Sequence, residues 1–343
     1  MRALLNTLFI TTQGAYLSRE RETIAVQVDH ETRIRVPIHT LEGIICFGQV
    51  SCTPFLLELA AEHGVAITFC RENGRFMARM QGPISGNVLL RRRQYQASDE
   101  RAISANIARA IVTAKIANCR IVLLRAAREH AAEQPREALE FAGLRLSRIQ
   151  DALAGSDDLD LIRGHEGDAA ETYFSAFDHL IVAAKDSFFF EHRSRRPPLD
   201  NLNALLSFLY TLLAHDVAAA LESVGLDAQV GFLHRDRPGR PSLALDLMEE
   251  LRPVLADRLA LSLINRKQIT GDGFRRSATG GVVMDDDTRK EVLIQWQKRK
   301  KDEITHPFLG EKIALGLLPY VQALLLARYL RGDLDGYPPY FWR

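Results

Sequence analysis

The sequence predicts an α+β protein in which a small N-terminal β-rich domain precedes a larger, mainly α-helical domain. Short apolar segments separated by turn residues fill the first quarter of the chain, and long segments with helical spacing fill most of the rest. A length of 343 residues, with 47% hydrophobic and 25% charged residues, is enough for two domains that each bury a core. We therefore place the domains at residues 1–86 and 87–343.

The N-terminal part has the pattern of short strands interrupted by one helix. The predicted strands are "TLFIT", "AYLS", "TIAVQVD", "TRIRVPI", "GIICFG", "AITFC" and "RFMARM". Asn73-Gly74 separates the last two strands and predicts a tight β-hairpin. The helix is expected to begin near Thr53-Pro54, because proline suits the first helical turn, and to close at Gly64.

Helical spacing replaces the strand pattern from about Val88 and continues almost to the end of the chain. The predicted helices are "RAISANIARAIVTAKIANCRIVLLRAAREHA", "PREALEFAGLRLSRIQDAL", "GDAAETYFSAFDHLI", "NALLSFLYTLLAHDVAAALESVG" and "LGEKIALGLLPYVQALLLARYLRG". The second domain is therefore expected to be mainly helical and to carry most of the mass.

Composition excludes several classes of protein. The N-terminus lacks the charged-then-apolar layout of a signal peptide, and we expect no membrane span, so the predicted location is cytoplasmic. The four cysteines form no C-x-x-C pair, which argues against a zinc knuckle or a disulfide framework. A net charge of +1 does not indicate a class of partner.

The stretch "RGHEGDAAETYF" places a carboxylate on an apolar helix face. If the helix begins at about Gly164, Glu166 shares its face with apolar side chains, whereas Asp168 and Glu171 lie on the other side. The apolar residues of that face are Ala169, Ala170, Tyr173, Phe174 and Phe177. A buried carboxylate needs an arginine, a proton or a metal ion as its partner. The sequence therefore marks Glu166 as a candidate site residue.

A second group of candidate ligands lies in "QVGFLHRDRPGRPSLALDLMEELRP". His234 ends an apolar run, and a helix is expected to begin near Ser242, which would place Asp246 and Glu249 on one face. Carboxylates with one imidazole suit Mg²⁺ or Mn²⁺ better than a structural zinc ion. An ordinary hydrogen-bonded histidine and a solvated acidic pair remain the alternative.

Basic residues gather at several points of the second domain. One cluster is Arg91-Arg92-Arg93, and another lies in a loop stiffened by Pro197-Pro198. The candidates for contacts with DNA phosphates are Arg193, Arg195, Arg196, Arg237 and Arg240. A solvated surface without a nucleic-acid partner is the competing interpretation of such clusters.

Several motifs together resemble the CRISPR-associated spacer-acquisition integrase, the larger catalytic subunit of the adaptation complex. The motifs are "LNTLFITTQGAYLSRE", "VPIHTLEGIICFGQVSCTPFLLELAAEHGVAITFCRENGRFMAR", "RGHEGDAAETYF", "RRPPLDNLNALLSFLYTLL", "GFLH" followed by "PSLALDLMEELRP", and "QALLLARYLRGDLDGYPPYFW". They span nearly the whole chain in matching order. The final "YPPYFW" is most similar to integrases of type I-C systems.

The resemblance implies a divalent-metal site made by Glu166, His234 and Glu249, with Asp246 as an additional acid in the same pocket. Some relatives have aspartate where this chain has Glu249. The implied ion is Mg²⁺ or Mn²⁺, and the implied activity is insertion of short foreign DNA fragments into a CRISPR array. In that reaction the 3′-hydroxyl of the fragment attacks a phosphate at a repeat end.

The resemblance also implies partners. They are double-stranded and branched DNA, a second copy of the chain, and a small dimeric adaptation protein that bridges two such homodimers into a heterohexamer. Two other functions remain open. One is a metal-dependent branched-DNA nuclease, and the other is a non-catalytic DNA-binding scaffold in which Glu166 pairs with an arginine such as Arg163.

Overall fold

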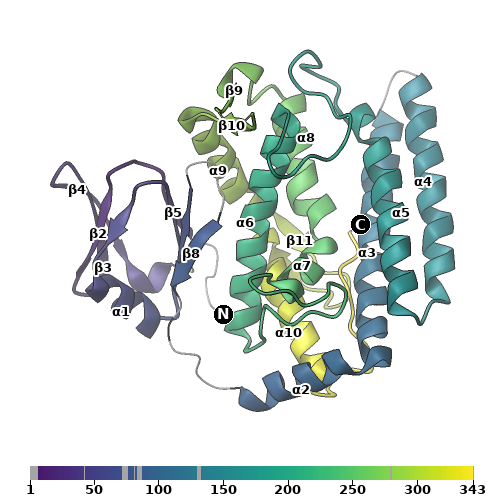
Figure 1. Ribbon diagram of the computed structural model, residues 1–343, viewed down its shortest axis with the longest axis horizontal. Coiled ribbons are helices and arrows are strands. Elements are labelled where there is room, and N and C mark those ends of the chain that lie inside the picture. Colours follow the sequence, from purple (N-terminus) through teal and green to yellow (C-terminus); the bar gives the residue numbers. More distant parts are fainter. Residues whose placement is uncertain are drawn as a thin grey trace. The chain divides into compact units, whose positions relative to one another are not determined.

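The computed structural model describes residues 7–41, 43–71, 76–80, 82, 87–129, 133–278 and 280–342 (Figure 1). The chain divides into two compact units, which are described separately. The first comprises the described residues of Met1–Gly86 together with Asp285–Asp302, and the second comprises those of Asn87–Met284 and Glu303–Arg343. The predicted fold class is confirmed, because strands dominate the N-terminal part and helices dominate the larger remainder.

The first unit contains two four-stranded sheets. One sheet has the order β1-β5-β7-β8, with the first three strands parallel and β8 antiparallel to β7. Its strands are β1 (Thr7–Ile10), β5 (Gly43–Phe47), β7 (Ala66–Cys70) and β8 (Phe76–Met80). The antiparallel pairing of β7 with β8 is the one that the hairpin prediction requires. The predicted turn at Asn73-Gly74 lies outside the described residues.

The second sheet has the order β4-β3-β2-β6, and a helix packs in the same core. The strands are β2 (Tyr16–Glu20), β3 (Thr23–Val28), β4 (Glu31–Pro37) and β6 (Ser51–Cys52), with a 3₁₀ turn, η1 (Ile38–Thr40). Helix α1 (Pro54–Glu62) begins where the sequence predicts, and the Thr53 hydroxyl accepts a hydrogen bond from the Leu56 amide at 3.2 Å.

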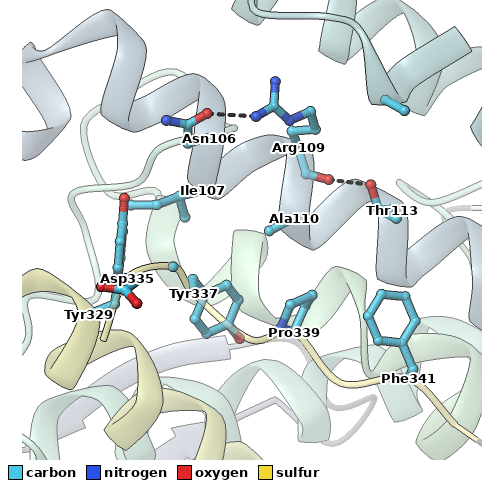
Figure 2. Close-up of a pocket in the computed structure, with 12 residues that line it drawn as sticks. Asn106, Ile107, Arg109, Ala110, Thr113, Tyr329, Asp335, Tyr337, Pro339 and Phe341 are labelled. Atoms are coloured by element: carbon cyan, nitrogen blue, oxygen red, sulfur yellow. Dashed lines mark hydrogen bonds between the residues drawn. The ribbon is translucent and has the colours of Figure 1, made fainter. Parts of the chain in front are cut away.

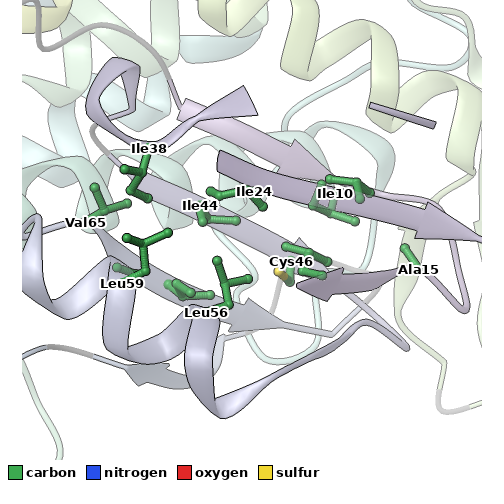
Figure 3. Packing of buried hydrophobic residues seen from close by; sticks show 13 residues of the cluster. Ile10, Ala15, Ile24, Ile38, Ile44, Cys46, Leu56, Leu59 and Val65 are labelled. Atoms are coloured by element: carbon green, nitrogen blue, oxygen red, sulfur yellow. The ribbon is translucent and has the colours of Figure 1, made fainter. Parts of the chain in front are cut away.

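The core of this unit is made by aliphatic side chains of α1 and the strands. Figure 3 shows Leu56 and Leu59 of α1 directed towards Ile24 and Ile44, and all four side chains are fully buried. Each such side chain stabilises the fold by about 1.5–3 kcal/mol relative to exposure. The unit also includes α9 (Asp286–Lys300), whose amide of Thr288 donates to Asp285 at the helix start.

The second unit is mainly helical, with two short hairpins. Its helices are α2 (Val88–Asp99), α3 (Arg101–Glu129), α4 (Glu133–Ala154), α5 (Leu159–Ser175), α6 (Asn201–Ser223), α7 (Ser242–Glu249), α8 (Arg258–Asn265) and α10 (Leu318–Leu330). The hairpin strands are β9 (Phe274–Arg276), β10 (Val282–Met284), β11 (Glu303–Thr305) and β12 (Lys312–Ala314). Short 3₁₀ turns are η2 (Phe177–Leu180), η4 (Gly271–Gly273) and η5 (Leu315–Leu317).

The predicted start of the last helix is wrong. Residues 312–314 form β12, which pairs with β11, and α10 begins only at Leu318. Pro319 in the first turn of α10 marks the true start, because proline is favoured there and disfavoured in a helix interior.

Helices α3, α4 and α5 lie side by side, and α3 also packs against α7 (Figure 1). Helix α7 continues into α8 through a π-helical turn, Pro253–Asp257. Because α3, α5 and α7 meet, polar side chains on their facing surfaces come together in the interior of this unit.

Helix α6 contradicts the expectation that no segment is long and apolar enough to cross a membrane. Asn201–Ser223 meets both criteria by length and composition. However, 61% of its apolar stretch is buried inside the protein, so packing against neighbouring helices accounts for its composition.

Candidate functional site

The structure brings Glu166, His234 and Glu249 together around one lysine. Glu166 lies on α5, Glu249 ends α7, and His234 lies in the loop before α7. Lys115 of α3 contacts Oε1 of Glu166, and its Nζ is 2.7 Å from Oε2 of Glu249. Nε2 of His234 is 4.0 Å from Oε1 of Glu249. Lys115 therefore connects Glu166 with Glu249, and His234 approaches the other oxygen of Glu249.

Glu249 is held ionised although its side chain is only 3% exposed. Burial alone would raise its pKa, but Arg252, Lys115 and His234 lower the pKa of Glu249 to about 2. Burial in turn lowers the pKa of Lys115, and the charges of Glu249 and Glu166 outweigh burial and raise that pKa overall. The site therefore contains buried charges that depend on one another.

Two cations divide the oxygens of Glu249 between them. Arg252 donates from its NH1 group to Oε1, whereas Lys115 faces Oε2. Oε2 lies 2.7 Å from the ammonium, a short contact between opposite charges. Each oxygen of Glu249 is thus next to one cation.

Asp246 holds His234 in place. Its side chain is fully buried; Oδ2 accepts hydrogen bonds from the amides of Phe232 and Leu233 at 2.6 and 2.9 Å, and Oδ1 accepts from the amide of His234. Nδ1 of His234 is 2.6 Å from the same Oδ1. Because a carboxylate can only accept from Nδ1, this nitrogen carries a proton, and Nε2 lies on the side of the ring near Glu249. Both oxygens of Asp246 are therefore used by the loop and by His234.

The loop before α7 also depends on a glycine. A side-chain carbon at Gly231 would lie 2.7 Å from Oδ2 of Asp246 and 2.9 Å from the carbonyl carbon of Ser242. Only glycine lets this backbone approach the carboxylate so closely. Helix α7 begins at Ser242, as predicted, and the Ser242 hydroxyl donates to the Arg235 carbonyl at 3.3 Å.

The residues fit a divalent cation by charge and donor type. Among the described residues, no three His, Cys, Asp or Glu side chains already lie in a metal-binding arrangement. Nevertheless, the carboxylates of Glu166 and Glu249 flank the positive charge of Lys115, and Nε2 of His234 is 4.0 Å from Oε1 of Glu249. Oxygen donors with one imidazole are suited to Mg²⁺ or Mn²⁺.

Sequence reasoning missed Lys115 and Arg252. Lys115 interrupts the apolar run "IVTAKIANC", and it is the first lysine in a chain whose earlier basic residues are all arginines. A single lysine in an apolar run, after a long stretch with only arginines as basic residues, was the sequence signal that could have indicated a buried cation. Arg252 lies one helical turn after Glu249, a spacing that permits an ion pair on one face.

Glu166 does not pair with Arg163, as the scaffold alternative requires. Arg163 donates to the Leu233 carbonyl and to Asp160, both at 2.7 Å. Its role in this structure is to tie α5 to the loop that carries His234. Lys115 is the partner of Glu166.

The predicted DNA-contacting arginines differ in exposure. Arg195, Arg196 and Arg237 are exposed, and Arg240 is partly buried. Arg193 is directed inward instead, where it donates to Asn203 at 2.5 Å and to other polar groups of the same region. The geometry thus leaves the other four as surface candidates and gives Arg193 an internal role.

Glu250, the neighbour of Glu249, serves the C-terminal segment. Its Oε1 accepts from the Tyr337 hydroxyl at 2.5 Å, and its Oε2 accepts from the Tyr340 amide at 2.6 Å. Asn118 of α3 donates to the carbonyls of Glu250 and Tyr340 and accepts from the Trp342 amide. These bonds clasp residues 337–342 to α3 and α7.

A pocket of about 590 Å³ lies elsewhere on α3, between that helix and the C-terminal segment (Figure 2). Its lining includes Asn106, Arg109, Thr113, Tyr329, Tyr337 and Phe341, and Arg109 donates to Asn106 within it. None of the predicted ligands lines this pocket. This pocket is therefore separate from the cluster of predicted ligands.

Comparisons with known proteins agree with one another. Residues 8–298 match the family described as CRISPR associated protein Cas1. The chain is 55% identical over its full length to the whole of CRISPR-associated endonuclease Cas1 1 of Chlorobaculum tepidum, and 52% identical to the whole of CRISPR-associated endonuclease Cas1 2 of Rhodospirillum rubrum.

Solved structures show the same fold. A CAS1 protein from Thermotoga maritima matches with a TM-score of 0.82 at 24% identity, covering 96% of this chain and 99% of that one. A casposase bound to integration product matches with a TM-score of 0.84 at 21% identity, covering 97% and 93% of the two chains.

Proposed function

The chain belongs to the CRISPR-associated Cas1 family of endonucleases and integrases, and from this membership we propose that it inserts short foreign DNA fragments as new spacers into a CRISPR array. The observation that carries the proposal is the convergence of Glu166, His234 and Glu249 from three segments onto a single cation-holding centre. Family membership indicates the class of reaction. The contacts among Glu166, His234, Glu249 and Lys115 indicate where in this chain the reaction is proposed to occur.

The proposed reaction is a transesterification. The 3′-hydroxyl oxygen of the DNA fragment attacks a phosphorus atom at the edge of a repeat, a new P–O bond forms, and the existing P–O bond breaks to release a 3′-hydroxyl end. The proton of the attacking hydroxyl is lost, and the leaving oxygen gains one, so the number of phosphodiester bonds is conserved. Mg²⁺ or Mn²⁺, when bound, neutralises charge on the phosphate and makes the hydroxyl more acidic.

The protein's own residues divide the work at this site. Glu166, Glu249 and Nε2 of His234 would hold the cation, and Asp246 fixes the orientation of the imidazole through Nδ1. Arg252 neutralises Oε1 of Glu249, and Lys115 faces Oε2. The site is therefore prepared for charge that develops on a phosphate.

The same proposal includes the partners and the location. Exposed Arg195, Arg196 and Arg237, with Arg240, hold double-stranded or branched DNA through its phosphates. The protein forms a homodimer, and a small dimeric adaptation protein joins two homodimers into a heterohexamer in the cytoplasm. Structural similarity to a Cas6-RT-Cas1–Cas2 complex, with a TM-score of 0.82 at 23% identity, supports a partner of that kind. The subtype proposed from the sequence is type I-C.

One experiment separates the proposal from its rivals. The protein is incubated with Mn²⁺, a duplex with free 3′-hydroxyl ends and a repeat-bearing plasmid, and covalent products are resolved on a denaturing gel. Joining is the expected result. Cutting without joining would favour the branched-DNA nuclease, and binding without either would favour the scaffold.

The matched variants come from one helix. Glu166→Ala is expected to abolish joining while DNA binding is retained. Asp168→Ala, which removes a carboxylate on the opposite side of α5 that pairs with exposed Arg145, is expected to join normally. Joining by Glu166→Ala at the wild-type rate would overturn the assignment of the site.

A further inference from the structure

A second buried carboxylate lies behind the candidate site. Asp257 is 1% exposed and ends the π-helical turn that connects α7 with α8. Its Oδ1 accepts a hydrogen bond from the Tyr210 hydroxyl at 2.6 Å, and its Oδ2 accepts one from the Tyr173 hydroxyl at 3.1 Å. One carboxylate thus connects two tyrosines that belong to different helices.

Tyr173 connects Asp257 to the helix of Glu166. The two residues lie seven positions apart on α5, so they share one face two turns from each other. Phe174 and Phe177 pack at 5.3 and 5.5 Å from the Tyr173 ring and leave it little freedom to move. The hydrogen bond to Tyr173 therefore restricts rotation of α5 about its axis and translation along it, and so restricts the position of Glu166.

Tyr210 connects Asp257 to the surroundings of Glu249. The Arg252 guanidinium carbon lies 5.1 Å from the centre of the Tyr210 ring, and the Arg193 guanidinium lies 5.3 Å from it. Such cation–π contacts are strong where water is excluded. Within the described part of the chain, Arg252 Nε has no hydrogen-bond partner, so its ring contact and its bond to Glu249 together define where the guanidinium lies.

We propose that Asp257 is a positioning residue for the cation site, and that it sets the separation of Glu166 and Glu249 through Tyr173 and Tyr210. The proposal rests on the proposed function, since it assigns a role within the same site. Among the described residues, Asp257 accepts its hydrogen bonds from Tyr173 and Tyr210 and not from the side chains proposed to hold the cation. It fixes the position of Glu166 through Tyr173 and α5, and it fixes the position of Glu249 through Tyr210 and Arg252.

The first test compares two isosteric variants. Asp257→Asn removes the second acceptor oxygen, and we expect about tenfold weaker Mn²⁺ binding by calorimetry, about 10–100-fold slower joining, and unchanged DNA affinity. Glu250→Gln is the matched control, because Glu250 is also a fully buried carboxylate that accepts from a tyrosine hydroxyl. It is expected to lower thermal stability while leaving Mn²⁺ affinity near that of the wild type.

A milder pair of variants keeps the proposal testable if Asp257→Asn does not fold. Tyr210→Phe retains the ring against Arg252 and removes only the hydroxyl, and Tyr173→Phe does the same on α5. Each is expected to lose part of the Mn²⁺ affinity that Asp257→Asn loses. Wild-type affinity and joining rate in folded variants would overturn the positioning role, as would an equal loss in Glu250→Gln.

The last arm needs neither metal nor DNA. Urea unfolding of Asp257→Asn, Arg252→Met and the double variant measures whether the two sites act together. We expect a coupling that changes the unfolding equilibrium constant by about threefold or more. Additive effects would overturn the connection through Tyr210. If the wild type binds Mn²⁺ but does not join DNA, the proposed function fails, while the coupling and Mn²⁺ arms still decide the role of Asp257.

Discussion

At the scale of single residues, Lys115 takes the place that a cation would need. Its ammonium lies between Glu166 and Glu249 and offsets the repulsion of two buried carboxylates. The proposed binding of a divalent cation at this centre would therefore compete with the lysine.

Replacing Lys115 should strengthen metal binding. Lys115→Met removes the competing ammonium, so Mn²⁺ affinity is expected to rise roughly tenfold, equivalent to about 1.4 kcal/mol. Without metal the same variant should be less stable than the wild type, because two carboxylates lose their partner. Calorimetric titration with Mn²⁺ measures the affinity. Lys185→Met, at an exposed lysine paired with Asp178, is the control, and an unchanged or lower affinity in Lys115→Met would contradict competition.

Gly231 offers a prediction that leaves every proposed ligand in place. Gly231→Ala introduces a carbon 2.7 Å from Oδ2 of Asp246, so the loop that positions His234 must shift. Joining is expected to fall about tenfold or more, with lower thermal stability. Gly164→Ala is the control, because a side-chain carbon there meets nothing within 4 Å and alanine favours helix α5 by about 0.5–1 kcal/mol. Equal behaviour of the two variants would rule out the steric explanation.

The sequence predicted which side chains would meet, but not how their charges are balanced. Glu166 was identified because a carboxylate on an apolar helix face demands a partner, and the family resemblance then implied the set of Glu166, His234 and Glu249. Lys115 was missed because one lysine among apolar residues has the same pattern as a side chain that reaches solvent. Its pairing depends on α3 meeting α5 and α7, which local spacing does not specify.

At the scale of secondary-structure elements, the π-helical turn decides where Asp257 points. A π turn holds one more residue than an α turn, which rotates the following residues by about 100° around the axis. Asp257 thereby faces Tyr173 and Tyr210 instead of continuing the face set by α7. The sequence did not reveal this turn, because Pro253 at its start is equally compatible with a new α-helix.

Burial of Asp257 predicts a pH dependence of stability. Burial raises its pKa to about 6, although hydrogen bonds from Tyr210 and Tyr173 and the charges of Arg252 and Arg193 lower it. A raised pKa in the folded state means that this group stabilises the fold most at low pH and loses that contribution as pH rises through about 6. The wild type should therefore gain on the order of 2 kcal/mol relative to Asp257→Asn between pH 7 and pH 4.5.

Urea unfolding of both proteins across that pH range measures the difference. Comparing the two proteins at each pH cancels the titration of other groups. A difference that stays constant with pH, or that grows as pH rises, would contradict a raised pKa for Asp257.

Element prediction succeeded where patterns were local. The start of α1 followed from Thr53-Pro54, and the pairing of β7 with β8 followed from the alternation around a turn signal. It failed for β11 and β12, because strands of three residues are too short to show alternation. Helix α6 is apolar on most sides because its neighbours cover it, and composition alone does not distinguish that from a membrane span.

At the scale of the whole molecule, replacing surface arginines should weaken DNA binding without changing the affinity of the buried site for Mn²⁺. Replacing Arg195 and Arg196 with alanine is expected to weaken DNA binding for all sequences and to reduce the slope of log K against log[salt] by about one unit per lost phosphate contact. Mn²⁺ affinity should not change. Filter binding or fluorescence anisotropy over a range of salt concentrations gives the slope.

The control removes two other exposed arginines, Arg145 and Arg148 of α4, from outside the loop. That double variant should retain the wild-type salt slope. If it lost as much slope as the loop variant, the contribution would come from the overall charge of the protein and not from contacts made by the loop.

The clasp formed by Asn118 has a consequence for synthesis of the protein. Asn118 forms hydrogen bonds with Tyr340 and Trp342, which lie 222 and 224 residues later in the chain. Glu250 accepts a hydrogen bond from the Tyr340 amide, 90 residues later. While the chain emerges from the ribosome, α3 and α7 are made long before these partners, so the buried amide of Asn118 and the carboxylate of Glu250 remain unsatisfied. The unit that carries the candidate site therefore acquires its full stability only after residues 337–342 have been made and have packed against α3 and α7.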